Sequence, residues 1–333
     1  MVRRLVLAPL FIVATLFVVG TVPLSLLIAA FASRYVPGRW RPLRLIWFVA
    51  VWMVFESLVL VALFGLWLVS GFGWKLDSPG FQDVHYRLMG WFLRRVVGSA
   101  RFTFGLETVA DVPPEPDEGV RPLLVFARHA GPGDSLLLID ALLNRFDRHP
   151  RIVLKDVLQW DPAVDIALNR LPSRFISTRT RPGEAAVQAI AALSATLGPR
   201  DALVIFPEGG NFTSGRREKA IEKLAASGLE EYAERARAME RLLPPKPGGV
   251  LAAVQNAPDA VILLVGHAGL EDMDTIRQVW SGMKMDITLH TRMWSAYVSD
   301  LPRERRELEV WLYDRWAEMN DWLTTVGDEL PDA

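Results

Sequence analysis

Two long apolar segments dominate the first quarter of the chain. The first extends from Leu5 to Ala32 without a charged side chain, and the second extends from Leu45 to Phe72 with Glu56 as its one charge. As a helix rising about 1.5 Å per residue, either segment exceeds the roughly 30 Å of a bilayer's hydrocarbon core, and each is longer than the apolar core of a signal peptide. The pattern therefore predicts two membrane helices.

Basic residues flank these segments on both sides and leave the topology open. They are Arg34, Arg39, Arg41 and Arg44 in the connecting loop and Arg3, Arg4 and Lys75 at the outer ends. Counting positive charges places the loop in the cytoplasm. A hairpin that enters one leaflet, kinked at Pro23, would instead keep all the cations at one interface, and we favour it. Glu56 is expected to snorkel or to be buried against the partner helix rather than to act as a functional charge.

The next segment, His85 to Arg101, has the pattern of an amphipathic helix. One face carries Arg87, Arg94, Arg95 and Arg101, and the other carries Leu88, Met89, Phe92, Leu93, Val96 and Val97. This pattern is typical of a helix at an anionic lipid surface and also of an ordinary core-facing helix. Because it follows two membrane helices, we favour the interfacial position.

After a proline-rich linker at 112–116, short branched runs alternate with helical patterns, which indicates an α/β domain. The expected strands are 122–128, 151–155, 174–177, 202–206, 260–266 and 285–290, and the expected helices lie near 135–144, 184–197 and 216–243. We therefore divide the chain into a two-helix anchor at 1–75, an interfacial helix with a first strand at 76–111, and an α/β domain with a C-terminal helix at 112–333.

A histidine and an aspartate five residues apart follow the first strong strand. His129 and Asp134 flank Gly131-Pro132-Gly133, which permits a tight turn that folds the carboxylate back toward the imidazole. Such an aspartate fixes the tautomer and leaves the other ring nitrogen as a base. In the alternative, Asp134 only caps the next helix and His129 is a surface residue.

A second polar group follows the strand at 202–206. The chain there reads Phe206-Pro207-Glu208-Gly209-Gly210, which places a carboxylate and two glycines at the strand's carboxyl end. A carboxylate can bind polyol hydroxyls, and glycines let backbone N–H groups approach a phosphate. An ordinary turn fits the same residues.

These blocks resemble those of the glycerolipid acyltransferases, which include lysophosphatidic acid acyltransferase. His129 to Asp134 resembles the first block, Phe206 to Gly209 the third, and Phe175 to Arg179 the second. The segments 242–249 and 311–316 are similar to the lysocardiolipin acyltransferase branch. The chain departs from the family pattern at Arg128, where the family usually has asparagine, and at Gly210, where it usually has threonine or serine.

The resemblance implies a fold with a central mixed sheet flanked by helices, and a role for each matching residue. His129 would be the general base and Asp134 its orienting partner, while Arg179, with Arg181 as its rival, would bind the acceptor's phosphate. Glu208 and Gly209, with Pro207 and Gly210 beside them, would position the glycerol. Arg128 would bind a second phosphate or serve a structural role.

The implied reaction moves an acyl chain from acyl-coenzyme A or acyl carrier protein to lysophosphatidic acid, giving phosphatidic acid without a metal or redox cofactor. A remodelling acyltransferase for another lysophospholipid and a membrane-bound, lipid-binding pseudoenzyme remain alternatives. We expect the chain at the cell membrane with its catalytic domain on the cytoplasmic side.

Composition and the lack of certain motifs argue against several other classes of protein. A net charge of -1, with 37 basic and 38 acidic residues, provides no cationic field for nucleic acid. The absence of cysteine excludes an acyl-cysteine intermediate. The chain has no G-x-S-x-G, P-loop or H-E-x-x-H motif, and its other histidines show no metal-ligand spacing.

Overall fold

The structure is a computed structural model, and it describes residues 2–36, 40–112, 121–177, 182–269 and 287–329. The chain forms two compact units. The first comprises Met1–Glu107, Leu137–Pro182 and Lys284–Ile287, and the second comprises Thr108–Leu136, Gly183–Met283 and Thr288–Ala333. The first unit thus combines the predicted anchor with part of the predicted α/β domain.

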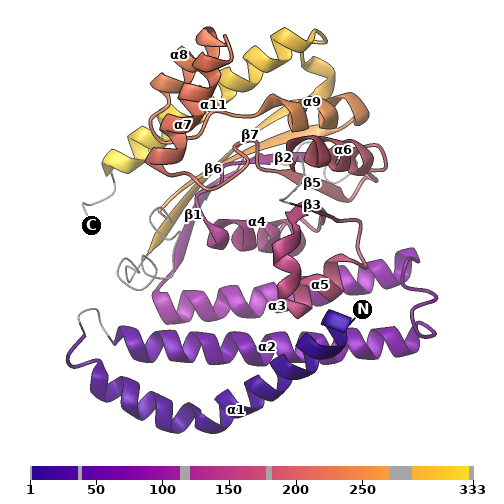
Figure 1. The fold of residues 1–333 in the computed structure, drawn as a ribbon, viewed down its shortest axis with the longest axis vertical. Coiled ribbons are helices and arrows are strands. Elements are labelled where there is room, and N and C mark those ends of the chain that lie inside the picture. The colour runs from indigo at the N-terminus through magenta and orange to yellow at the C-terminus, as the bar shows by residue number, and fades with distance from the viewer. Residues whose placement is uncertain (1, 37–39, 113–120, 178–181, 270–286, 330–333) are drawn as a thin grey trace. The chain divides into compact units, whose positions relative to one another are not determined.

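Three long helices open the first unit: α1 (Val2–Ala32), α2 (Arg41–Val69) and α3 (Pro79–Phe104). Both α1 and α2 are long and apolar enough to cross a membrane. They pack against each other, and α1, which contains Pro9 and Pro23, is bent (Figure 1). The hydroxyl of Ser57 on α2 donates to Thr15 Oγ1 on α1 at 2.8 Å. Thr15 Oγ1 in turn donates to the carbonyl of Met53 on α2 at 3.4 Å, so two hydrogen bonds join the helices here.

Much of the apolar surface of α1 and α2 is exposed. The exposed side chains include Leu5, Leu10, Val13, Leu16, Phe17, Leu24, Leu27, Ile28 and Phe31 on α1 and Val49, Leu58, Val61 and Phe64 on α2. A contiguous apolar surface of this kind is rare on soluble proteins. Glu56, by contrast, is buried and accepts a hydrogen bond from Trp52 Nε1 at 2.8 Å, as expected for a carboxyl buried in the helix packing.

Helix α3 contains the amphipathic segment that the sequence predicted at 85–101. Its apolar face packs against α2 and the short helix α5 (Pro162–Leu168) through Leu88, Met89, Trp91 and Phe92. The four arginines of its other face are exposed. Protein therefore covers much of the apolar stripe, and the position of α3 at a lipid surface stays a prediction.

The first unit is completed by the last part of α4 (Pro132–Asn144), β3 (His149–Lys155), the 3-10 helix η2 (Asp156–Trp160), α5 and β4 (Arg174–Ile176). Strands β3 and β4 are parallel. The Asp161 side chain caps α5 by accepting from Val164 N–H at 2.8 Å. Tyr86 of α3 stacks on His149 of β3 with ring centroids 4.2 Å apart.

The second unit is built on a mixed sheet. It contains β1 (Glu107–Asp111), β2 (Leu123–Ala127), β5 (Asp201–Ile205), β6 (Val261–Ala268) and β7 (Thr288–Tyr297), in the order β1-β7-β6-β2-β5. β2 is parallel to both β5 and β6, whereas β7 is antiparallel to β6. Every residue of β2, β5 and β6 is buried, as expected for branched strands that are covered on both faces.

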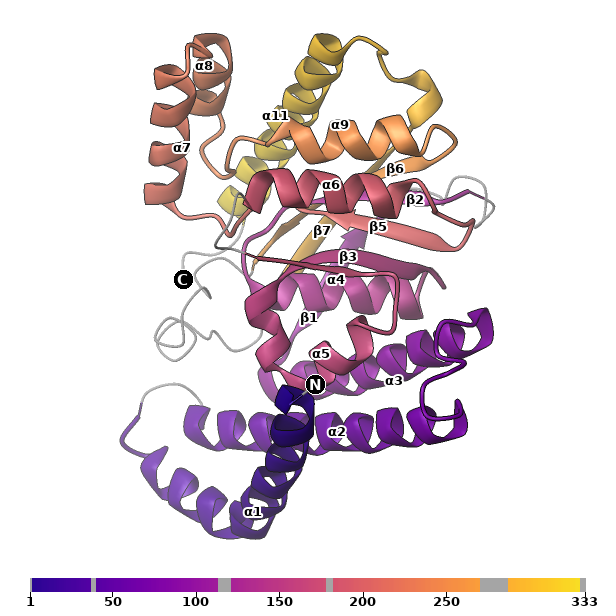
Figure 2. The same cartoon turned by 45° about the vertical axis from the view of Figure 1, so that its right-hand side comes forward.

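The helices of this unit are the start of α4, α6 (Pro182–Ser194), α7 (Ser214–Ala226), α8 (Glu230–Ala238), α9 (Pro247–Asn256) and α11 (Arg305–Glu329), with the 3-10 helix η3 (Val298–Asp300). Figure 2 shows α6, α9 and α11 together on one side of the strands. The mixed sheet and its flanking helices confirm the predicted fold class.

Two predicted elements were wrong in extent. The helix expected at 216–243 is two helices, because Gly228 between α7 and α8 has φ +74° and breaks the helical path. The strand expected at 285–290 begins at Thr288 and continues to Tyr297, where it pairs with β6; Met285 and Asp286 lie outside the described residues.

Candidate active site

The carboxyl ends of three parallel strands position the candidate site. His129 follows β2, Phe206 follows β5, and His267 lies near the end of β6. The register pairs Ala127 with Val265, which places the ends of β2 and β6 side by side. In open α/β sheets this edge is where ligands commonly bind.

His129 and Asp134 are in contact. Nδ1 of His129 lies 3.2 Å from Oδ1 of Asp134, and the imidazole packs on the ring of Phe206 with centroids 4.5 Å apart. A carboxylate only accepts, so Nδ1 carries the proton and Nε2 keeps its lone pair. The His129 side chain is 21% exposed, which leaves room for a reacting group beside it.

The turn folds Asp134 back toward His129, as the sequence predicted. Oδ2 accepts from the N–H groups of Ala130 at 2.6 Å and Gly131 at 2.9 Å, and Oδ1 accepts from Ser135 Oγ at 2.9 Å. Burial alone would raise the pKa of Asp134, but hydrogen bonds from His129 and His267 hold that pKa well below its usual range. The carboxylate therefore stays ionised and orients the imidazole without taking its proton.

Glu208 does not have the open position that we expected for binding a glycerol. Its side chain is 1% exposed, and its two oxygens accept from the backbone N–H groups of His129 and Leu243, each at 3.0 Å. Burial raises the pKa of Glu208 to about 7, against the lowering effect of these two hydrogen bonds. In this structure the carboxyl holds the His129 backbone in place.

Gly209 and Gly210 lie beneath two cationic side chains. Gly209 has φ +71°, and a Cβ at this position would lie 2.5 Å from Nζ of Lys246; one at Gly210 would lie 3.3 Å from a guanidinium nitrogen of Arg216. Pro207 accepts from the backbone N–H of Lys246 at 2.8 Å. Sequence reasoning missed both: Lys246 meets the loop only in the folded chain, whereas Arg216 follows the loop directly and bonds to the carbonyl of Asn211 at 3.1 Å.

The Arg128 guanidinium is directed into the protein. Its side chain is 1% exposed and donates to the backbone carbonyls of His267 and of Arg241, the latter at 3.2 Å. This position favours the structural role that we weighed against phosphate binding. Arg179 and Arg181 lie outside the described residues, just after β4, so their phosphate-binding role stays a prediction.

His267 is a further residue of this site that sequence reasoning did not select. Its Nε2 lies 3.2 Å from Oδ2 of Asp134 and 3.3 Å from the carbonyl oxygen of Arg128. The available signal was a histidine at the end of a buried strand, which by itself does not indicate a contact. Among the residues that the structure describes, no group of three or more acidic, histidine or cysteine side chains is arranged to hold a metal ion.

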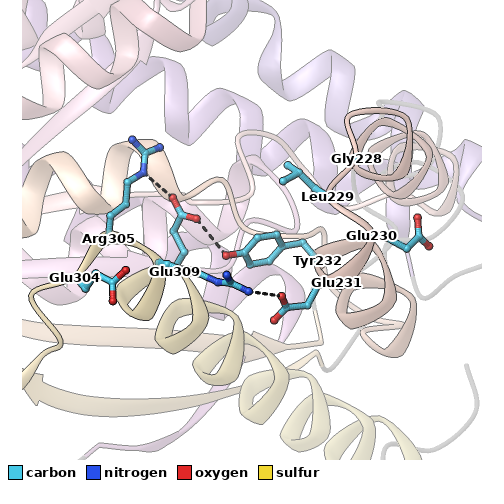
Figure 3. Close-up of a pocket in the computed structure, with 9 residues that line it drawn as sticks. Gly228, Leu229, Glu230, Glu231, Tyr232, Glu304, Arg305 and Glu309 are labelled. Atoms are coloured by element: carbon cyan, nitrogen blue, oxygen red, sulfur yellow. Dashed lines mark hydrogen bonds and ion pairs between the residues drawn. The ribbon is translucent and has the colours of Figure 1, made fainter.

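A separate pocket of about 480 Å³ lies between α8 and the start of α11, and no residue of the His129 site lines it (Figure 3). Several of the polar side chains that line it bind one another. Glu309 accepts from Arg305 at 3.0 Å and from the Tyr232 hydroxyl at 3.2 Å, and Glu231 accepts from Arg306 at 3.2 Å. These contacts link the two helices and indicate a structural network.

Comparison with known proteins gives two findings. Residues 107–267, just under half of the chain, match the model of the acyltransferase family. The chain is also similar to the crystal structure of the 1-acyl-sn-glycerophosphate (LPA) acyltransferase PlsC from Thermotoga maritima, with 13% identity, a TM-score of 0.44, and coverage of 84% of this chain and 99% of that one. No protein of curated function matches. The family match, which includes both His129 and His267, supports acyl transfer as the general activity of the chain.

Proposed function

We propose that this protein transfers a fatty acyl chain from a thioester to the free glycerol hydroxyl of lysophosphatidic acid, giving phosphatidic acid. The observation that carries the proposal is the His129–Asp134 contact. It leaves a basic nitrogen at a partly exposed position, next to a glycine loop with two cations above it. A base beside an anion-binding loop suits an acceptor that carries both a hydroxyl and a phosphate.

In the proposed reaction, Nε2 of His129 takes the proton of the acceptor hydroxyl as its oxygen attacks the thioester carbonyl. The tetrahedral intermediate then collapses with cleavage of the C–S bond. The departing thiolate takes the proton from the His129 imidazolium, so the products are an ester and a free thiol. Backbone N–H groups in the first turn of α4 would stabilise the oxyanion, because these groups have no partner within the helix.

The phosphate of the acceptor would lie against Gly209 and Gly210, within reach of Lys246 and Arg216. The resemblance of the second block also makes Arg179 a candidate for binding a phosphate. Loss of Arg179 should raise KM for the acceptor more than it lowers kcat, because a clamp that acts equally in ground and transition states contributes uniform binding. Arg179→Ala should cost about tenfold to a hundredfold in kcat/KM, and Arg181→Ala less. A larger defect at Arg181 would assign phosphate binding to that residue.

Both substrates of such an enzyme carry a fatty acyl chain, and the lysophospholipid acceptor resides in a bilayer. The exposed apolar surface of α1 and α2 would attach the enzyme to the membrane that supplies the acceptor. The donor would be acyl-coenzyme A or acyl carrier protein, and the active site would face the cytoplasm. No metal or redox cofactor is part of the proposal.

The test is a panel assay of the full-length protein in detergent, with lysophosphatidic acid and other lysophospholipids against acyl-coenzyme A and acyl carrier protein. We expect turnover with lysophosphatidic acid and a loss of about 10² to 10⁴ in rate for His129→Ala. Turnover only with a larger head group would favour a remodelling acyltransferase. Binding of lysophospholipid without any turnover would favour a lipid-binding pseudoenzyme.

A further inference from the structure

His267 and Arg128 form reciprocal contacts at the ends of two neighbouring strands. The Arg128 guanidinium donates to the His267 carbonyl, and Nε2 of His267 lies 3.3 Å from the Arg128 carbonyl. The register that pairs Ala127 with Val265 also places His267 at the level of His129. The two imidazoles therefore lie on adjacent strands, and Asp134 contacts both of them.

The tautomer of His267 follows from its neighbours. Its Nε2 faces Oδ2 of Asp134 at 3.2 Å and the Arg128 carbonyl, and both of these groups are acceptors. Nε2 must therefore carry a proton. The His267 side chain is buried, so this donor is directed at the carboxylate and not at solvent.

We propose that His267 is a positioning residue of this site, whose Nε2–H holds Oδ2 of Asp134 so that Oδ1 remains directed at Nδ1 of His129. With the Ala130 and Gly131 N–H groups, His267 completes three donors around Oδ2. That oxygen is then occupied, and His129 bonds mainly to Oδ1, at 3.2 Å against 3.4 Å for Oδ2. His267 acts through Asp134 and touches no reacting atom.

This inference rests on the proposed function, and it makes a separate claim about the tautomer of His129. A carboxylate in a fixed orientation keeps the proton on Nδ1 of His129 and the lone pair on Nε2. When His267 no longer donates, the carboxylate is freer to turn and His129 can adopt the other tautomer, which is not a base toward the acceptor. The loss should therefore appear in kcat, with KM for the acceptor unchanged.

The experiment compares His267→Gln, His267→Asn and His267→Phe with the full-length protein in detergent. Glutamine places an amide N–H near the position of Nε2, whereas the shorter asparagine and the apolar phenylalanine do not. We expect His267→Phe and His267→Asn to lower kcat about tenfold to a hundredfold, by analogy with the loss of the hydrogen-bond partners that orient metal ligands. His267→Gln should retain most of kcat, and His290→Phe on β7 serves as the control for loss of a histidine.

The second measurement is ¹⁵N NMR of protein labelled only at its five histidines. The ring signals of His129 should report the Nδ1–H tautomer in the wild type and in His267→Gln, and a mixture of tautomers in His267→Asn. Equal kcat losses in the glutamine and asparagine variants, or an unchanged His129 tautomer in the folded asparagine variant, would overturn the proposal. The two proposals can fail separately. If the wild type lacks transferase activity while His267→Asn still shows the change of tautomer at His129, the proposed function is refuted and the role of His267 is kept.

Discussion

At the scale of single residues, Asp134 determines which ring nitrogen of His129 carries the proton, because its carboxylate can only accept a hydrogen bond from that ring. In Asp134→Asn the amide oxygen is expected to keep the Ala130 and Gly131 N–H bonds, so the NH₂ group would face Nδ1 of His129. That arrangement selects the tautomer with its proton on Nε2, which cannot act as a base. We expect kcat to fall by about 10² to 10⁴ with the fold retained, measured by steady-state kinetics and near-ultraviolet circular dichroism. Retention of about a tenth of the activity would contradict this role, because even the low end of that range is larger.

The raised pKa of Glu208 predicts that the stability of the protein depends on pH. Burial raises its pKa from 4.5 to about 7 in the folded protein. Between these pH values the folded protein binds more protons than the unfolded chain, so the free energy of unfolding should fall as pH rises, by up to roughly 3 kcal/mol. Below this window the stabilisation is fully present, and above about pH 7 it is lost.

Glu208→Gln removes the titrating group and serves as the comparison. Thermal unfolding between pH 5 and 8 should show the wild type losing stability relative to this variant as pH rises through about 7. Parallel curves for the two proteins would show that the Glu208 carboxyl does not titrate in this window.

The sequence predicted the contacts of this site that are local and missed those that are not. His129 and Asp134 are five residues apart in a turn rich in glycine, so their contact follows from the chain itself. Glu208 instead bonds to backbone groups 79 and 35 positions away, and Arg128 and His267 are 139 positions apart. These partners depend on which strands become neighbours, and no single-sequence pattern specifies that.

At the scale of elements, periodicity identified the branched strands and the long helices, and it failed where an element is short or interrupted. Helices α5 and α9 have only 7 and 10 residues, and the sequence analysis predicted no helix at either place. The division between α7 and α8 depends on Gly228, whose left-handed conformation ends the first helix. A polar helical pattern on both sides of that glycine gave no sign of the break.

Helix α5 binds the start of α1 through one buried carboxylate. Asp165 is 1% exposed and accepts from Arg3 at 3.0 Å and Arg4 at 2.8 Å, which are 35% and 38% exposed. We expect Asp165→Asn to destabilise the first unit by about 1–3 kcal/mol, below the 3–5 kcal/mol typical of a fully buried pair, because solvent screens the arginines. The measurement is limited proteolysis, in which we expect this variant to be cleaved near the N-terminus faster than the wild type.

The matched control is Arg87→Ala, since Arg87 forms an exposed i,i+4 pair with Asp83 at 3.0 Å and its side chain is 72% exposed. Such a surface pair contributes about 0.5 kcal/mol or less, so this variant should behave as the wild type. If protease cleaves Asp165→Asn and the control at the same rate, the Asp165 contacts do not hold the start of α1.

At the scale of the whole chain, apolar surface and not charge should attach the protein to membranes. The net charge of -1 offers little electrostatic attraction, whereas α1 and α2 expose large side chains along most of their length. We expect the protein to stay in the membrane fraction in about 1 M salt, where the Debye length is only about 3 Å and surface charges are screened. It should leave the membrane only in detergent. Release by salt alone would mean that neither helix is inserted.

The packing of α3 also bears on whether α2 crosses the bilayer. Ring contacts join Phe48 to Phe104 and Trp52 to Phe92, so α3 lies along the middle of α2. Leu88 and Met89 of α3 also pack against the buried cluster that includes Leu63. The arginines of α3 are exposed on the other face. If α2 spanned the membrane, these charges would lie at the depth of the hydrocarbon core, where each costs about 2.5 kcal/mol or more. The contact therefore favours a hairpin that enters one leaflet.

The chain has no cysteine, so single cysteines can report the topology without background. Ser33→Cys places a thiol at the end of α1 beside the connecting loop, and Lys75→Cys places one beyond the end of α2. In sealed vesicles of one known orientation, a hairpin in one leaflet should let a membrane-impermeant maleimide label both variants from the same side. Two spanning helices should put the thiols on opposite sides, so that one variant is labelled only after the vesicles are opened. The second result would contradict the hairpin, and with it the position of the α3 arginines at a single interface.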